Sequence, residues 1–114
     1  MRYFKAQEFV HCNPSCYVEQ MNSAFLEKLD TARDLAKCPF YLLSAYRSSE
    51  HEKSRGRTGK GYHTFGRAVD VSCSDGASRW RIVYACMRVG LSVGIYPTFI
   101  HIDDRPNCIV FYGK

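Results

Sequence analysis

Two short segments of this sequence combine imidazole and carboxylate side chains at spacings suited to binding a metal ion. The first runs from His63 to Asp70, and Gly66 between them lets the chain turn sharply, so that a loop histidine can face back onto a strand carrying Asp70. The second holds His101 and Asp103, which in a strand point to one face about 7 Å apart. Two neutral imidazoles and one carboxylate are a familiar ligand set of catalytic zinc, whose fourth position is left for water. The spacing therefore favours a zinc site formed by His63, Asp70 and His101.

A second carboxylate near such a zinc ion would complete a hydrolytic site. Zinc lowers the pKa of bound water from about 15.7 towards 7, and a neighbouring carboxylate can take the proton during attack on a carbonyl. Asp103 is placed for that task, because strand alternation puts it on the same side as His101. In the plainer alternative, His63 caps a loop and Asp70 caps a turn. Asp103 would then only orient His101 or pair with Arg105, and spacing alone leaves both interpretations open.

The elements that must position these residues follow from hydrophobic periodicity and turn signals. Apolar residues at helical spacing predict helices at about residues 23–37 and 77–89, the first capped by Asn22 and the second stopped by Gly90. Short apolar runs predict strands at residues 40–45, 69–72, 92–96, 98–102 and 109–112. Two helices and five short strands predict an α+β domain, with both helices packed on a mainly antiparallel sheet.

The remaining segments carry fewer apolar residues. Residues 48–61 hold three glycines and almost no apolar side chain, which is typical of a long surface loop. Residues 4–10 are expected to be a covering segment at the start of the chain. Tyr62 and Tyr96 either flank a cleft or pack as ordinary aromatic residues.

Length, composition and charge fit one domain, residues 1–114. The chain is 46% hydrophobic and 24% charged, which excludes intrinsic disorder, and its length excludes a second domain. No apolar stretch approaches the roughly 20 residues that a membrane-spanning helix needs. The net charge of +5 favours polyanionic surroundings, and much of the excess lies between Arg47 and Arg67, in either a flexible basic loop or a ligand-facing one. Residues 48–60 hold no aromatic side chain for stacking on bases, which disfavours nucleic-acid binding.

Six of the 114 residues are cysteines, a share below the roughly 8–10% that marks a small disulfide scaffold. Cys38 and Cys86 lie in apolar periodic stretches and are expected to be buried thiols. Cys12 and Cys16 are the one local pair. They form a metal-binding knuckle with His11, a local disulfide or two free thiols, and the sequence leaves these alternatives open.

Three motifs follow one another along the chain: Ser44-Ala45-Tyr46-Arg47, His63-x-x-Gly66-x-Ala68-x-Asp70, and Gly94-Ile95-Tyr96-Pro97-x-Phe99-Ile100-His101-Ile102-Asp103. In order and spacing they resemble the zinc D-Ala-D-Ala carboxypeptidase family of metallopeptidases, which includes phage endolysins and bacterial murein peptidases. The family's fold is shared with the hedgehog signalling domain. The likeness runs through nearly the whole chain, and the best match is a compact single-domain branch often carried by phages and prophages.

The resemblance implies roles for individual residues. His63, Asp70 and His101 would bind zinc, and Arg47 would help to hold a carboxylate or carbonyl oxygen of the substrate. Arginine suits that role because its planar fork gives two parallel charge-assisted hydrogen bonds.

Two positions depart from the family pattern. Gly61 stands where many members have a serine, two residues before the first zinc histidine. Thr98 stands where better-known members have a carboxylate that serves as general base. Asp103 is therefore our choice of base, whereas Asp104 should point away from the metal.

The resemblance predicts a zinc-dependent peptidoglycan peptidase that cuts an amide bond in the stem peptide of the bacterial cell wall. It would be a D-Ala-D-Ala carboxypeptidase or an L-Ala-D-Glu endopeptidase of the endolysin type. The alternative, favoured by Thr98, is a non-catalytic zinc-containing binding module of the hedgehog-like fold. Residues 1–9 lack the apolar core of a secretory signal, so we expect a monomer made in the bacterial cytoplasm that acts on the wall after release or export by another route.

Overall fold

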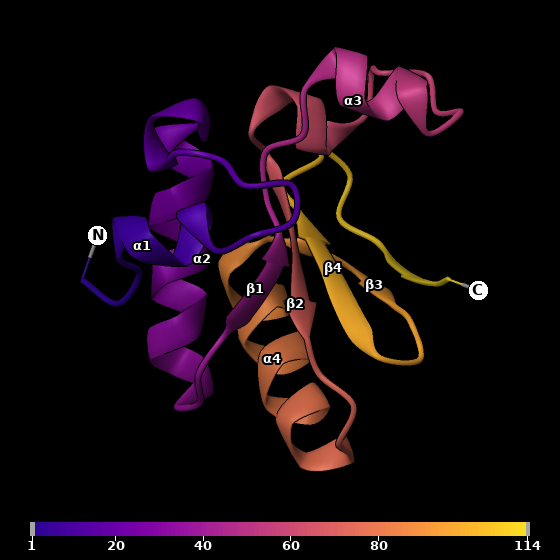
Figure 1. Cartoon of the computed structure of the whole chain (residues 1–114). Helices are drawn as coiled ribbons and strands as arrows, with labels where there is room; N and C mark the ends of the chain where they lie inside the picture. Colours follow the sequence, from indigo (N-terminus) through magenta and orange to yellow (C-terminus); the bar gives the residue numbers. More distant parts are fainter. Residues whose placement is uncertain (1, 114) are drawn as a thin grey trace.

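The computed structural model describes residues 2–113, which form a five-stranded sheet with two long helices on one side (Figure 1). In chain order the elements are α1 (Ala6–Val10), the single-turn helix η1 (Val18–Gln20), α2 (Ser23–Ala36), β1 (Tyr41–Ser44), α3 (Ser49–Ser54), the single-turn helix η2 (Tyr62–Phe65), β2 (Ala68–Ser72), α4 (Gly76–Val89), β3 (Ser92–Ile95), β4 (Phe99–Asp103) and β5 (Val110–Tyr112). Both long helices and all five strands lie within one residue of their predicted bounds.

The sheet has the strand order β1-β2-β4-β3-β5. Three neighbouring pairs are antiparallel, and β5 adds to β3 in parallel. The predicted α+β class and the mainly antiparallel sheet are confirmed. In the central pair, Asp70 of β2 stands opposite His101 of β4. These two predicted site residues are 31 positions apart in the sequence. The pairing of β2 with β4 makes them neighbours on adjacent strands.

Strand alternation separates the apolar core from the chemistry. Val69, Val71, Ile100 and Ile102 are fully buried on the face that α2 and α4 cover, and the two helices pack against each other there. The residues between them in sequence, including Asp70 and His101, face the other way. The core therefore fixes the position of the polar face without sharing it.

Cap residues set the ends of the long helices. The side chain of Asn22 accepts the Phe25 N–H at 2.9 Å, as expected of an N-cap, and Gly90 ends α4 with a φ of 82°. Asp75 caps α4 by accepting the Ser78 N–H at 2.9 Å. None of the helices within residues 2–113 has both the length and the apolar character needed to cross a membrane.

Two short helices were not predicted. The segment 48–61, predicted to be a loop, contains α3, and the covering segment 4–10 contains α1. Both are too short for apolar periodicity to show. A buried carboxylate rather than an apolar stripe fixes α3, because Glu52 is only 4% exposed and bonds two arginines. Cys86 is buried, as expected, whereas Cys38, which was also expected to be buried, is half-buried.

The N-terminal segment is tied to α2 by one carboxylate. Asp30 accepts the backbone N–H groups of Arg2, Tyr3 and Phe4 at 2.8, 2.8 and 3.0 Å. Burial would raise the pKa of Asp30, but these hydrogen bonds outweigh it and hold the pKa below its usual range. The carboxylate form therefore stabilises the folded state above about pH 4, and this contribution is lost as the pH falls through the lowered pKa.

We expect Asp30→Ala to lower the free energy of unfolding at pH 7 by about 2–3 kcal/mol, because three N–H groups lose a charged acceptor. Urea denaturation measures this loss, and the gap between variant and wild type should shrink below about pH 4. Glu27→Ala, an exposed substitution on the same helix, is the matched control and should change stability by less than about 0.5 kcal/mol. Equal unfolding midpoints for Asp30→Ala and wild type would contradict the anchoring role.

Candidate metal centre

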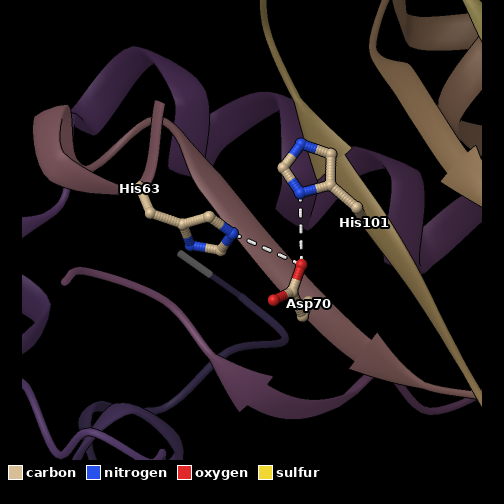
Figure 2. A group of neighbouring side chains, drawn as sticks. All are labelled: His63, Asp70 and His101. Carbon is tan, nitrogen blue, oxygen red and sulfur yellow. Dashed lines mark hydrogen bonds and ion pairs between the residues drawn. The ribbon is translucent and has the colours of Figure 1, made fainter. Parts of the chain in front are cut away.

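The three predicted metal ligands converge on one point. His63 comes from η2, Asp70 from β2 and His101 from β4, and both rings point toward the Asp70 carboxylate (Figure 2). Oδ1 of Asp70 lies 3.3 Å from Nε2 of His63 and 3.1 Å from Nδ1 of His101. One ligand atom from each residue lies within 4.8 Å of the others. The structure thus brings the predicted set together from three separate elements.

Gly66 makes the approach of His63 possible. This glycine ends η2 with a φ of 67°, a left-handed conformation that reverses the chain between the histidine and β2. A side chain there would also collide with the backbone of Gln20 and Met21. The turn is fixed to the start of α2, because the Gly66 carbonyl accepts the Asn22 N–H at 2.8 Å. The role that the sequence suggested for this glycine is confirmed.

Each imidazole has its outer nitrogen occupied by an acceptor. Nδ1 of His63 lies 2.7 Å from the Ala45 carbonyl, and Nε2 of His101 lies 2.7 Å from Oδ2 of Asp103. Both acceptors require a donated proton, so the inner nitrogens, Nε2 of His63 and Nδ1 of His101, are left with lone pairs. Nε2 of His63 is buried and has no hydrogen-bond partner among residues 2–113. Two lone pairs and a carboxylate facing one another repel unless a cation lies among them.

The pKa values of Asp70 and His101 also favour a cation bound at this centre. Burial would raise the pKa of Asp70, but the neighbouring imidazoles of His101 and His63 hold it well below its usual range, so the group is a carboxylate at neutral pH. Burial would lower the pKa of His101, but the carboxylates of Asp103 and Asp70 on either side of the ring raise it. A bound cation would take the place of the proton that these carboxylates attract. Two imidazole nitrogens and one carboxylate oxygen are donors that suit zinc.

Arg47 lies beside the centre and is held in place by three acceptors. Its Nε donates to Glu52 at 3.0 Å, and its Nη1 donates to Ser44 at 3.1 Å and to Oδ2 of Asp70 at 3.3 Å. Its second terminal nitrogen, Nη2, has no protein partner in the described chain and can donate to a ligand. The predicted position of Arg47 beside the site is therefore seen, with the side chain already oriented.

Glu52 is a site residue that the sequence did not single out. Burial would raise its pKa, but Arg47 and Arg57 lower it, and its two oxygens accept from these arginines at 3.0 and 2.8 Å. The surrounding polar run holds several charged residues alike, and no periodicity distinguished this one. Its buried position became visible only once α3 was folded against the site.

A cleft of about 500 Å³ opens over the centre. Besides His63 and His101, its walls carry three guanidinium groups and three aromatic rings, namely Arg47, Arg57, Arg105, Tyr62, Tyr96 and Phe111. Tyr62 and Tyr96 therefore flank the cleft, one of the two outcomes left open by the sequence. Glu52 is the one acidic residue among those that line it. The cleft is suited to an anionic ligand with an apolar portion. A second hollow of similar volume, about 490 Å³, lies against α4 and shares no lining residue with this cleft.

Asp103 lies behind the ring of His101. It is fully buried, and it contacts Nε2, the ring nitrogen that faces away from Asp70. Arg105 donates to it from Nε at 2.9 Å and from the backbone N–H at 3.1 Å. Burial would raise the pKa of Asp103, but Arg105 and His101 hold it well below its usual range. Asp103 and His101 share one face of β4, as the sequence predicted. The contacts of Asp103 match the alternative in which it orients His101. Asp104 points away and pairs with Arg67 at 2.7 Å.

Comparisons with known proteins give one family. The sequence profile of the family Peptidase M15 matches residues 2–103. The peptidoglycan L,D-endopeptidase MepK of Escherichia coli K12 is 41% identical over 76 residues, and MepK of E. coli O157:H7 and of Shigella flexneri match equally. The aligned part covers 60% of this chain and 41% of each relative, so the chain spans less than half the length of the curated proteins it matches. No solved structure shows a significant match.

We expect Asp103→Ala to weaken zinc affinity about 10- to 100-fold, because His101 loses the acceptor that fixes its orientation and its proton. Competition with a chromophoric chelator measures the dissociation constant. Asp104→Ala, which removes a neighbouring carboxylate with no contact to His101, is the control and should bind zinc like the wild type. Unchanged affinity in Asp103→Ala would show that the contact does not support the metal centre.

Proposed function

The chain belongs to the Peptidase M15 family, and on that premise we propose that it is a zinc-dependent peptidase that hydrolyses an amide bond in the stem peptide of bacterial peptidoglycan. The family suggested by the sequence motifs is confirmed. The observation that carries the proposal is the convergence of Nε2 of His63, Oδ1 of Asp70 and Nδ1 of His101. The name of the MepK relatives supports a cell-wall substrate, and an endopeptidase over a carboxypeptidase. Family membership also supports a hedgehog-like arrangement of the α+β fold.

In this proposal His63, Asp70 and His101 hold the zinc ion. When bound, zinc supplies a water molecule of lowered pKa and a Lewis acid that polarises a carbonyl. The Ala45 carbonyl and the Asp103 carboxylate hold the protons on the outer ring nitrogens, which keeps the inner lone pairs directed at the metal. These contacts are made within the protein, so the ligand geometry costs little reorganisation on metal binding.

The substrate would be held by the cationic wall of the cleft. The free Nη2 of Arg47 is placed to donate to a carbonyl or carboxylate oxygen beside the metal. Arg57 and Arg105 each have one edge bound to a buried carboxylate and further N–H donors without a partner in residues 2–113. Because stem peptides carry free carboxylates, this wall supports such a substrate. Tyr62 and Phe111 lie 5.4 and 5.2 Å from the guanidinium of Arg105 and form the apolar part of the same wall.

Asp103 contributes to this mechanism by orienting His101. To serve as the general base of the sequence-based prediction, it would have to leave both Arg105 and His101. The two roles separate in one preparation of Asp103→Asn, a substitution that keeps size but removes the charge. If Asp103 is the base, the variant keeps its zinc while kcat falls roughly 100-fold or more. If Asp103 orients His101, the variant has a changed zinc affinity.

A non-catalytic zinc-binding module is the second candidate function. One observation favours it: in the described chain, Asp70, Asp103 and Glu52 are each bonded to an arginine, and the position three residues before His101 is Thr98. A protein of this kind would bind zinc and wall fragments without cutting them.

Digestion of purified peptidoglycan by the zinc-loaded protein tests the proposal. We expect mass spectrometry to find new amino and carboxyl ends within the stem peptides, and elemental analysis to find about one zinc per chain. His63→Ala should lose both the zinc and the activity. His11→Ala, which removes an exposed histidine away from the centre, should keep both. Full zinc in His63→Ala would refute the metal site, and full zinc without new ends in the wild type would favour the binding module.

We expect Arg47→Lys to bind zinc normally and to lower kcat/KM on stem peptides about 10- to 100-fold, because a lysine ammonium cannot reproduce the fork of donors. The initial rate of release of new amino groups measures this. Arg55→Lys, an exposed arginine in the same segment, is the control and should leave kcat/KM unchanged. The same kcat/KM for Arg47→Lys and wild type would make this arginine a purely structural partner of Glu52.

A further inference from the structure

Two cysteines lie at the ends of the turn that joins α1 to η1. Cys12 and Cys16 are both buried, with 5% and 3% of their surface exposed. The carbonyl oxygen of Phe9 accepts both of their backbone N–H groups, each at 3.2 Å, so the two residues approach each other across the turn. The turn is fixed to the sheet, because the Asn13 N–H donates to the Leu43 carbonyl at 2.9 Å. The two cysteines are therefore held together by backbone contacts that do not depend on their sulfur atoms.

The two thiols share one environment at the C-terminal end of α1. Sγ of Cys12 donates to the Glu8 carbonyl at 3.4 Å, and Sγ of Cys16 donates to the next carbonyl, that of Phe9, at 3.7 Å. Contact with the Cys12 thiol lowers the pKa of Cys16 to about 7, against the effect of burial. The same contact, together with burial, raises the pKa of Cys12. One thiol is thus disposed to ionise beside a second that stays protonated.

Three other cysteines lack this arrangement. Burial raises the pKa of Cys38, Cys73 and Cys86, which makes their thiols poor nucleophiles. The Cys12 and Cys16 pair therefore combines a nucleophilic sulfur with an adjacent second sulfur, as thiol–disulfide exchange requires.

The pair lies behind the segment that supports the metal centre. The backbone N–H of Tyr46 lies near the sulfur of Cys16 and helps to lower its pKa. The carbonyl of the preceding residue, Ala45, is the one that accepts Nδ1 of His63, and the following residue, Arg47, lines the cleft. The pair therefore lies near the chain segment that carries part of the site.

We propose that Cys12 and Cys16 form a redox site, which closes to an intramolecular disulfide across the turn between α1 and η1. The proposal does not depend on the peptidase activity. The oxidant is a low-molecular-weight disulfide of the glutathione class. Because α1 is only five residues long and lies at the start of the chain, its local opening gives such an oxidant access.

The exchange has two steps. The thiolate of Cys16 attacks one sulfur of oxidised glutathione, forming a mixed disulfide and releasing one glutathione thiolate, which takes up a proton. The thiol of Cys12 then loses its proton, and its sulfur attacks the Cys16 sulfur of the mixed disulfide and releases the second glutathione. Two protein thiols are oxidised, and one glutathione disulfide is reduced to two thiols.

Peptide mapping of the full chain after equilibration with reduced and oxidised glutathione tests the proposal. Trypsin releases residues 6–28 as one peptide, which contains Cys12, Cys16 and no other cysteine. After free thiols are alkylated, we expect this peptide in oxidising buffer to be unalkylated and two hydrogen masses lighter than its dithiol form. A doubly alkylated peptide at every glutathione ratio would overturn the proposal.

Single substitutions test the order of the two steps. Cys12→Ser should trap glutathione on Cys16, whereas Cys16→Ser should leave Cys12 without an adduct. The oxidised wild type should unfold roughly 5–10 °C above the reduced protein. Cys12→Ser should lose this difference, and Cys108→Ser, an exposed control, should retain it. A difference that persists in Cys12→Ser would assign the stabilisation to another cysteine pair and overturn the proposal.

Discussion

The structure depends on one half-buried carboxylate, which faces one arginine and two imidazole nitrogens. Oδ1 of Asp70 faces the inner nitrogens of His63 and His101, and Oδ2 accepts from Arg47. Burying a charge costs several kcal/mol unless partners compensate for the lost water. Arg47 gives part of that compensation, and a cation between the carboxylate and the two lone pairs would give the rest. The need to satisfy Asp70 therefore explains why three elements meet at this point.

The groups that hold the two histidines form a second layer around the centre. Ala45 holds His63 through its carbonyl, and Asp103 holds His101 through its carboxylate. The charge of Asp103 is in turn balanced by Arg105. Because each contact fixes the proton on an outer ring nitrogen, the inner lone pairs are directed before any metal arrives. A centre built in this way would bind a metal ion without rearranging its ligands.

The cationic wall of the cleft depends on two buried carboxylates. Glu52 and Asp103 are buried carboxylates, and each binds the inner edge of arginines whose outer edges reach the cleft. Arginines fixed on one side and open on the other recognise an anion at low entropic cost. This arrangement supports the proposed peptidoglycan substrate through its carboxylates.

The sequence by itself determined the elements and the donor set. Periodicity placed the helices at residues 23–37 and 77–89 to within one residue, because each buries an apolar stripe that is visible in the chain. The spacing from His63 to Asp70, with His101 on a later strand, named three donors that the structure brings together. These features are local, so the order of residues carries them.

Only the tertiary structure decided the contacts between distant segments. Alternation along β4 placed Asp103 and His101 on one face, but the ring orientation that puts Asp103 behind the imidazole depends on Asp70, 31 residues from His101. Similarly, α3 exists because the buried Glu52 bonds Arg47 and Arg57, an interaction with no periodic signature. Charged groups pair by distance and burial rather than by sequence spacing, so their partners were settled only when the chain had folded.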